Sequence, residues 1–468
     1  MIQHNHRNLK PDNADNWIFS PLQSIDFMKK IMALLCLFTV VASCGDRQDT
    51  SYKAVIADPL LFSSTVKNLN DIVLENNFPP MVAARNYVYA TIAAYECVAA
   101  GDTSYQSLSG QIRHMPSMPV PEGDEIDFSL AALLAMVKVG NAVTFPEGSM
   151  MEYHAHLLKM ADSLGMSRRM RKQSLAFSDT IAAAILTWSK GDNYLATRGA
   201  SRFNVLDSPG RWMPTPPMYA TGLEPHWMNI RPMVMDSAAQ FKPQRPPRFD
   251  MDDKSGIYYM ALMEVKHTVD SLNEEQKHIA DFWDDNPFKM NVTGHVMFAT
   301  KKFSPAGHWM NIVGIAGKKA GADFNTTVAA YAKTAIALFD AFISCWDEKY
   351  RSRYIRPETV INTTIDQEWR PYIQTPPFPS YTSGHSTISS AAAEVMTGFF
   401  GDQLAFTDTS LLEFGIANRE IRSFRNAAQE ASISRLYGGI HYRFDLDAGN
   451  KSGGRLGAFI DQKIKMKN

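Results

Sequence analysis

The sequence contains little that would direct the protein to a nucleic acid, a metal cluster or a disulfide scaffold. Its formal net charge is only -1, so no global attraction to polyanions is expected and any anion binding must be local. Only 4 of the 468 residues are cysteine, and no pair has the spacing of a metal knuckle. A Walker-type phosphate loop and a His-Glu-x-x-His motif are also absent. These absences exclude several common classes of binding protein and metalloenzyme.

Long apolar runs are scarce as well. The run Ile31–Val41 is about eleven residues long and therefore too short for a transmembrane helix. It follows Lys29 and Lys30 and leads into the small residues before Cys44, which is the layout of a signal peptide. The segment resembles a bacterial lipoprotein signal, in which Cys44 becomes the lipid-bearing first residue of the mature protein.

This interpretation divides the N-terminal part of the chain. We expect residues 1–27 to be a non-native extension, 28–44 the lipoprotein signal peptide and 45–57 a polar tether. The protein is then lipid-anchored in the bacterial cell envelope, on the periplasmic side or facing the surface. In that oxidising compartment Cys97 and Cys345 could pair, but their apolar, helical surroundings also fit buried free thiols.

Helical periodicity dominates the rest of the sequence, whereas strand-type alternation is scarce. We predict an all-α fold of two successive helical bundles, residues 58–250 and residues 251–468, with the active site in the second. An extended bundle of this kind often dimerises, so a homodimer is a further expectation. The predicted helices are 59–75, 81–99, 126–142, 149–164, 168–189, 253–271, 274–284, 307–320, 323–350, 384–400, 411–436 and 452–464.

Residues 199–250 interrupt the periodicity with clusters of proline. Proline lacks a backbone donor and fixes φ, so this section cannot be the interior of a helix. Its aromatic residues Trp212, Tyr219 and Trp227 indicate a loop that packs against the bundles rather than a free linker.

The first chemistry-bearing segment contains Lys349 and Arg356, seven residues apart and followed by Pro357. Seven residues are two helical turns, so both cations share a face if the helix capped by Asp323 extends this far. Proline then restricts Arg356 to extended conformations and ends the segment. A solvated basic surface is the alternative, and the neighbouring arginines of this run fit it.

The second segment leads from several prolines into Ser383, Gly384 and His385, followed by an alanine-rich run. A serine cap and a glycine that admits close approach predict a helix N-terminus with free amides, which favours an oxyanion. Capping alone would also explain Ser383. A charged His385 in the first turn opposes the helix dipole, so we expect a negative partner nearby.

The third segment contains Arg435, His441 and Asp445 around the pair Gly438–Gly439. The glycines break the helix, so Arg435 and His441 can converge from either side of the turn. Asp445, four residues after His441, can orient the ring through Nδ1 and leave Nε2 as nucleophile or ligand. A simple structural hydrogen bond is the alternative.

Together, Lys-x6-Arg-Pro, Ser-Gly-His and Ser-Arg-x5-His-x3-Asp resemble the motif of the vanadium-dependent haloperoxidase and type 2 phosphatidic acid phosphatase (PAP2) superfamily. The resemblance covers about the last quarter of the chain. One departure is Thr382, since the superfamily usually has proline before Ser-Gly-His. Threonine is a good cap, so we expect the turn to persist.

The resemblance implies a role for each residue of the motif. The cations Lys349, Arg356 and Arg435 would bind the oxygens of vanadate or phosphate, together with the Ser383 hydroxyl and the Gly384 amide. His441 would be the axial ligand of vanadium or the nucleophile that forms a phosphohistidine. His385 would act as general acid, and Asp445 would orient His441.

The motif does not separate a peroxidase from a phosphatase, because vanadate and phosphate share charge and shape. Trp346 and Phe378 resemble the aromatic pocket wall of chloroperoxidase-type members, which favours peroxide-dependent halide oxidation with the metal as a Lewis acid. Ordinary core packing would also explain these rings. One alternative function is an acid phosphatase that acts on phosphomonoesters. A second is a lipoprotein that binds phosphate without turnover.

Overall fold

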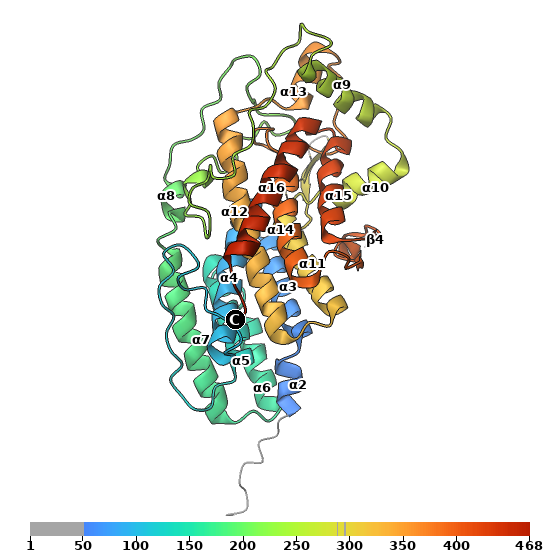
Figure 1. Cartoon of the computed structure of the whole chain (residues 1–468). Coiled ribbons are helices and arrows are strands. Elements are labelled where there is room, and N and C mark those ends of the chain that lie inside the picture. The colour runs from blue at the N-terminus through green and yellow to red at the C-terminus, as the bar shows by residue number, and fades with distance from the viewer. Residues whose placement is uncertain (1–50, 288, 294–295) are drawn as a thin grey trace, which may run out of the picture. The chain divides into compact units, whose positions relative to one another are not determined.

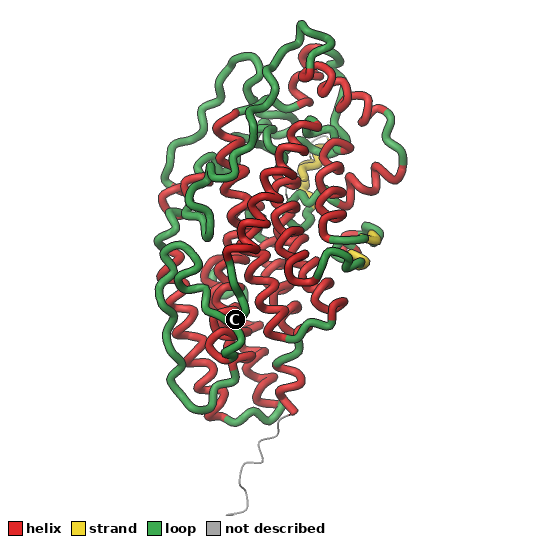
Figure 2. Tube along the Cα trace, viewed as in Figure 1, coloured by secondary structure: helices red, strands yellow, loops and turns green. Residues whose placement is uncertain are grey.

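A computed structural model describes residues 51–287, 289–293 and 296–468. Within these ranges the chain is mainly helical with very little sheet, which confirms the predicted fold class (Figure 2). The elements are α2 (Ser51–Ile56), α3 (Pro59–Glu75), α4 (Pro80–Gly101), α5 (Phe128–Val143), α6 (Met151–Ser163), α7 (Arg168–Ser189), α8 (Tyr194–Arg198), η1 (Trp227–Asn229), α9 (Ile257–Asp270), α10 (Glu274–Phe282), β1 (Lys289–Thr293), β2 (Val296–Thr300), α11 (Pro305–Ala320), α12 (Phe324–Ser352), α13 (Pro357–Thr364), α14 (Gly384–Phe400), β3 (Phe406–Asp408), η2 (Leu412–Phe414), β4 (Arg419–Ile421), α15 (Phe424–Tyr437) and α16 (Arg443–Lys463).

Local capping explains where many of these helices begin. Asp58 accepts a hydrogen bond at the start of α3, Ser167 does so for α7, and Asp323 does so for α12. Helices α3 and α7 have the predicted bounds, because each combines such a cap with a regular apolar stripe.

Helix α12 is the central helix of the core. It packs against α4, α11 and α14 (Figure 1). Every residue from Val328 to Trp346 is buried. By length and composition alone α12 could cross a membrane, but its apolar window is completely buried inside the protein. Its buried Asp340 accepts hydrogen bonds from the backbone amides of residues 233–235 and so ties the long connection to the core.

Helices α14 and α16 lie side by side, as Figure 1 shows. Their contact depends on Gly449, Gly453 and Gly457, which recur at a spacing of four on one face of α16. At each position a Cβ atom would lie less than 3 Å from the backbone of α14 or of its capping residue. Three glycines therefore set the distance between the helix that begins at Ser383 and the helix that carries Asp445.

The proline-rich section is an ordered connection between α8 and α9. Trp212 and Trp227 are buried, as predicted, whereas Tyr219 is 64% exposed and the prediction for it is wrong. The described residues belong to one compact unit whose main core includes residues from both sides of position 250. The boundary between two bundles at that position stays a prediction.

Some local predictions are corrected by the structure. The predicted helix 411–436 begins only at Phe424, because residues 406–421 form the short antiparallel pair β3–β4. Helix α16 begins nine residues before the predicted 452, and α13 and the β1–β2 pair were not predicted. Cys97 and Cys345 are both buried free thiols, so the pairing alternative is wrong.

The predicted extension 1–27 and signal 28–44, with Cys44, lie outside the described residues. The predicted tether 45–57 lies outside them only in part. Its last residues form α2, whose Tyr52 and Ile56 are buried against the main core. The tether prediction is therefore wrong for residues 51–57, because two large apolar side chains anchor them to the folded unit.

Candidate functional site

The three predicted segments meet at one place. Lys349 lies in the last turn of α12, Arg356 directly before α13, and Arg435 in the last turn of α15. Ser383 caps α14, and His441 precedes α16. Five helix ends therefore converge, and Lys349, Arg356, Ser383, Arg435 and His441 are all buried.

The first segment folds differently from the prediction. Helix α12 ends at Ser352, because Arg353 adopts a left-handed conformation with φ of 51°. Lys349 and Arg356 are therefore not on one helix face, and Pro357 starts α13 rather than only ending a segment. Arg356 is extended, as predicted.

The Arg356 guanidinium lies directly beside His441. Its Nε donates to the Phe378 carbonyl, and its Nη1 donates to the Ile440 carbonyl and lies 3.1 Å from His441 Nε2. Its Nη2 is buried without a partner. Burial lowers the pKa of Arg356 to about 9, so the group still carries its charge at neutral pH. One unpaired donor on a buried cation is suited to an anion.

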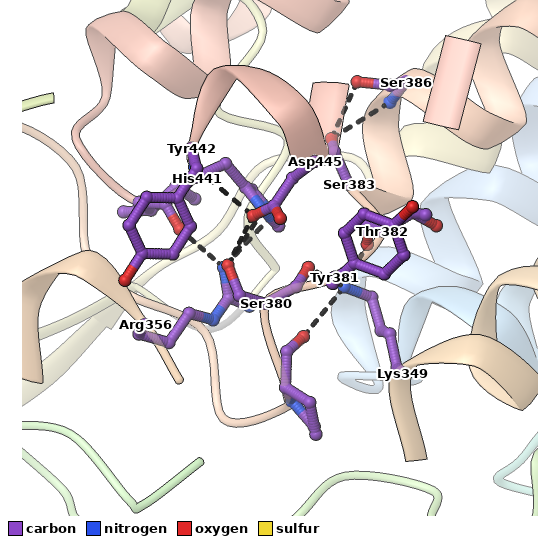
Figure 3. Close-up of polar contacts among 12 residues, drawn as sticks. Lys349, Arg356, Ser380, Tyr381, Thr382, Ser383, Ser386, His441, Tyr442 and Asp445 are labelled. Carbon is purple, nitrogen blue, oxygen red and sulfur yellow. Dashed lines mark hydrogen bonds and ion pairs between the residues drawn. The ribbon is translucent and has the colours of Figure 1, made fainter. Parts of the chain in front are cut away.

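Lys349 binds the loop that leads to Ser383. Its Nζ donates to the carbonyls of Pro379, Ser380 and Thr382, which uses its three protons (Figure 3). Burial lowers the pKa of the Lys349 ammonium to about 7. In this structure Lys349 shapes the loop and adds positive charge, while its direct contact with an oxyanion stays a prediction.

The N-terminus of α14 has the predicted form. The Ser383 hydroxyl accepts hydrogen bonds from the Ser386 amide and the Ser386 hydroxyl, so its own proton can be donated to an anion. Gly384 is the first helical residue and lines the adjacent cavity. Thr382 leaves the turn intact, and the helix dipole adds partial positive charge at this point.

His441 is oriented from its Nδ1 side. Nδ1 lies 2.8 Å from Asp445 Oδ2, and the same oxygen accepts from the Ser380 hydroxyl (Figure 3). Burial and the nearby cations, Arg356 first among them, place the pKa of His441 well below its usual value. A neutral ring that donates from Nδ1 keeps the Nε2 lone pair for bonding. At present that lone pair accepts from Arg356, so ligand binding at Nε2 requires the guanidinium to shift onto the anion.

Arg435 contributes the third cation. One terminal nitrogen donates to the Trp283 carbonyl at 2.7 Å, and its Nε is buried without a partner. The carboxylates of Asp284 and Asp285 lie near enough to oppose the effect of burial, which lowers the pKa of Arg435. Two arginines therefore each present an unpaired buried nitrogen in the same region.

The negative partner expected for His385 is Asp285. Its Oδ2 lies 3.5 Å from His385 Nε2 and its Oδ1 lies 2.8 Å from His308 Nδ1. His308 Nε2 lies 2.9 Å from Asp408 Oδ2, so the four side chains form a buried row. Sequence reasoning missed Asp285 and Asp408, because nothing in their local sequence marks them. Burial, followed by the Arg435 charge, lowers the pKa of His385 to about 4.

A cavity of about 310 Å³ opens beside these groups. His385, His441, Arg435 and Gly384 line one part of it. Apolar side chains line most of the rest, including the predicted wall residues Trp346 and Phe378, whose ring centroids are 5.0 Å apart. The proline-rich connection supplies Thr215, Pro216, Met218, Ala220 and Leu223 to the wall. A mostly apolar wall excludes water and strengthens charge interactions within the cavity.

The donor set fits a tetrahedral oxyanion with one bond to an imidazole. Arg356 Nη2 and Arg435 Nε are buried donors without partners, and the Ser383 hydroxyl and the start of α14 face the same region. The surplus of cations would be balanced by a multiply charged anion. Among the described residues no cluster of three or more His, Cys, Asp or Glu could hold a metal ion by itself. The predicted vanadate site needs no such cluster, because His441 would be the ligand and the other groups would bind the oxygens.

The fold and the site thus define an all-helical oxyanion-binding enzyme of the vanadate or phosphate type. The model of the VCPO second helical-bundle domain matches residues 329–467. A bacterial vanadium-dependent iodoperoxidase of known crystal structure is 42% identical, with a TM-score of 0.83 over 88% of this chain and 98% of that chain. This chain therefore belongs to the vanadium-dependent haloperoxidase family.

Two further crystal structures agree in fold. The holo form of a bacterial vanadium-dependent chloroperoxidase has a TM-score of 0.62 at 17% identity, over 82% of this chain and 92% of that chain. The apo form has a TM-score of 0.64 at 17% identity, over 83% of this chain and 94% of that chain. At this identity the likeness concerns the fold alone. No curated protein matches the sequence.

The row of buried groups predicts a pH dependence of stability. Burial disfavours a charged His308, but Asp285 and Asp408 outweigh it and raise its pKa from 6.5 to about 10. Between these values the folded protein keeps a proton that the unfolded chain releases, so stability falls as pH rises. This group alone contributes a slope of about 1.4 kcal/mol per pH unit.

Urea unfolding at pH 7, 8 and 9 measures this slope. We expect His308→Asn to lose less stability than the wild type as the pH rises, by about 1.4 kcal/mol per unit. Parallel slopes for the two proteins would show that His308 is not charged in the folded state.

Proposed function

We propose that this protein catalyses the oxidation of iodide by hydrogen peroxide with vanadate bound at His441. The observation that carries the proposal is the pair of buried, unpartnered guanidinium nitrogens of Arg356 and Arg435 beside a neutral His441. The 42% identity with a vanadium-dependent iodoperoxidase supports iodide as the halide. In the overall reaction, iodide loses two electrons to form hypoiodous acid, and peroxide takes up one proton and is reduced to water.

Each residue of the site has a task that follows from its contacts. His441 binds through Nε2, while Asp445 holds the opposite side of the ring and Ser380 fixes that carboxylate. Arg356, Arg435, Ser383 and the Gly384 amide neutralise and orient the oxygens of the anion. Bound vanadate would supply Lewis-acid activation of the peroxide.

His385 donates the proton that the reaction consumes. Its Nε2 faces Asp285, so Nδ1 is the nitrogen left to face the anion. The pKa of His385 is lowered by burial and then by Arg435. An anion between the cations offsets the charge of Arg435 and so favours the protonated ring. His385 can then donate a proton to a leaving oxygen and regain one between turnovers.

The aromatic wall contributes by excluding water and by holding the cations. The Phe378 ring lies 5.0 Å from Lys349 Nζ and 5.1 Å from the guanidinium carbon of Arg356. Trp346 packs against the same ring and donates from its indole to the Leu223 carbonyl. The two rings therefore keep one side of the cavity apolar beside the charged groups.

The purified protein tests the proposal directly. With orthovanadate and peroxide present, we expect triiodide to form from iodide at a rate that saturates with vanadate. Phosphate should inhibit competitively, since it fits the same donors. Hydrolysis of a phosphomonoester serves as the parallel assay. Vanadate-inhibited hydrolysis without iodide oxidation would reject the peroxidase proposal and favour the phosphatase.

The location of the enzyme is part of the proposal. The layout of Lys29, Lys30 and the run before Cys44 supports a lipid anchor in the bacterial cell envelope. Membrane attachment would then occur through the lipid alone. Metabolic labelling with a palmitate analogue, compared between wild type and Cys44→Ala, tests this part separately.

A further inference from the structure

The row Asp408–His308–Asp285–His385 extends from the candidate site into the core. Its members come from β3, α11, the loop after α10 and the first turn of α14. His308 and Asp408 are fully buried, and Asp285 is 3% exposed. Hydrogen bonds join Asp408, His308 and Asp285, although the first two are 100 positions apart, and a 3.5 Å contact joins Asp285 to His385.

The contacts of His308 require a charged ring. Each of its two nitrogens lies within 2.9 Å of a carboxylate oxygen, and a carboxylate can only accept a hydrogen bond. A neutral imidazole has one N–H, so both contacts are satisfied only by the imidazolium. Trp283 stacks on the ring at 4.6 Å and Phe282 meets it edge-on, which leaves the ring no freedom to turn.

Burying this charged triad costs more free energy than a purely structural role would require. A buried charged triad pays for desolvation, and apolar side chains of similar size often stabilise a core at least as well. Early in α11 a cation also opposes the helix dipole. The arrangement is therefore better explained by what it does to Asp285.

Asp285 has two possible partners at the site. One is His385, whose Nε2 lies 3.5 Å from Asp285 Oδ2. The other is Arg435, which interacts electrostatically with the Asp285 carboxylate. The contact of Oδ1 with His308 fixes the carboxylate in the first orientation. In this arrangement Arg435 Nε has no hydrogen-bond partner, and neither has the carboxylate of Asp284, whose charge also acts on Arg435. A carboxylate free to turn could instead pair with Arg435 and remove a donor from the anion.

We propose that His308 is a positioning residue that, held between Asp285 and Asp408, fixes the Asp285 carboxylate toward His385 and away from Arg435. His385 is thereby kept in the orientation for proton donation, and Arg435 is kept available for the anion. This inference rests on the proposed function, since both groups act on the same bound anion.

Two double variants test the inference with equal charge. His308→Asn with Asp408→Asn keeps a donor near the position of Nδ1, facing Asp285. His308→Gln with Asp408→Asn moves the donor to the position of Nε2, facing residue 408. Both variants remove one positive and one negative charge, so the cluster keeps its net charge. They differ by one methylene group and by whether Asp285 is held.

We expect the asparagine variant to keep kcat for iodide within about threefold of the wild type. The glutamine variant should lose about 100-fold in kcat, the effect of a displacement of about 1 Å at a catalytic group. Its vanadate affinity should fall about tenfold, because Asp285 competes for Arg435. Equal kcat values in two folded variants would overturn the inference, since a purely structural role changes only their stability.

A measurement on the wild type decides the case in which a variant does not fold. In protein labelled with 15N-histidine, both His308 nitrogens should carry protons at pH 7, whereas a single neutral tautomer would overturn the inference. The groups that face His308 are Asp285, Asp408 and the two aromatic rings, with Lys302 and Asp284 farther along the same loops. If the wild type does not oxidise iodide, the proposed function is wrong. The vanadate affinities of the two variants and the nitrogen signals of His308 then still test whether His308 positions Asp285.

Discussion

Replacing His441 with alanine is expected to lower kcat for iodide oxidation at least about a thousandfold, as loss of a central catalytic side chain does elsewhere. The imidazole is the neutral group among three buried cations that we propose as the ligand, and its Nδ1 lies 2.8 Å from Asp445. Without it, vanadate bound as we propose would lose its covalent attachment to the protein. Triiodide formation measured at saturating vanadate and peroxide gives the effect.

The control is His267→Ala. His267 is exposed at the end of α9 and is not one of the residues of the site, so its replacement should leave the rate unchanged. Phosphate binding to His441→Ala should persist, because both arginines and Ser383 remain. A wild-type rate in His441→Ala would show that the site is wrongly assigned. An inactive wild type that keeps its phosphate affinity would favour the lipoprotein that binds without turnover.

Gly453→Ala is expected to have the largest effect on stability. A Cβ at this position would lie 2.0 Å from the Thr387 carbonyl oxygen and 2.9 Å from Thr387 Cα, which are backbone atoms of α14. The two helices must separate, at a cost of about 3 kcal/mol or more. Since α14 begins at the Ser383 cap, we also expect vanadate affinity to fall. Urea unfolding and vanadate titration measure both effects.

The adjacent residue provides a matched control. Gly454 is also inside α16, and a Cβ there meets no atom within 4 Å. Gly454→Ala should therefore raise stability by up to about 1 kcal/mol, since alanine favours helix more than glycine does. Comparing the two variants separates the helix propensity of alanine from the steric effect of a Cβ atom at position 453. If both variants are equally stable, the α14–α16 contact is looser than the structure indicates.

The site residues could be predicted from the sequence to the extent that their arrangement is local. Ser383 caps α14 as expected, because a cap depends on residues three positions apart. Asp445 in the first turn of α16 contacts His441, which directly precedes the N-cap of that helix, and Gly439 has the positive φ that ends α15 and turns the chain. The conflict between a charged His385 and the helix dipole also required a negative partner, and Asp285 fills that place.

The misplaced elements share a different cause. Residues 411–423 have helix-compatible apolar spacing, but β3–β4 pairing and the turn at Gly415 replace the helix there. Lys349 and Arg356 would share a helix face only if α12 continued to Arg356. The helix ends instead at Ser352, where Arg353 is left-handed and Lys349 donates to the carbonyls of the loop before Ser383. In both places contacts distant in sequence outweigh local preference.

The sequence alone determined the all-helical class, the three segments and the identity of most groups of the proposed anion site. Those features follow from periodicity, caps and turns, which involve neighbours within a few residues. Only the tertiary structure decided that Lys349 donates to loop carbonyls, that the connection lines the cavity, and that Asp285, His308 and Asp408 form one row. Such contacts join positions 20 to 100 or more residues apart, and their geometry is set by how the helices pack rather than by any local pattern.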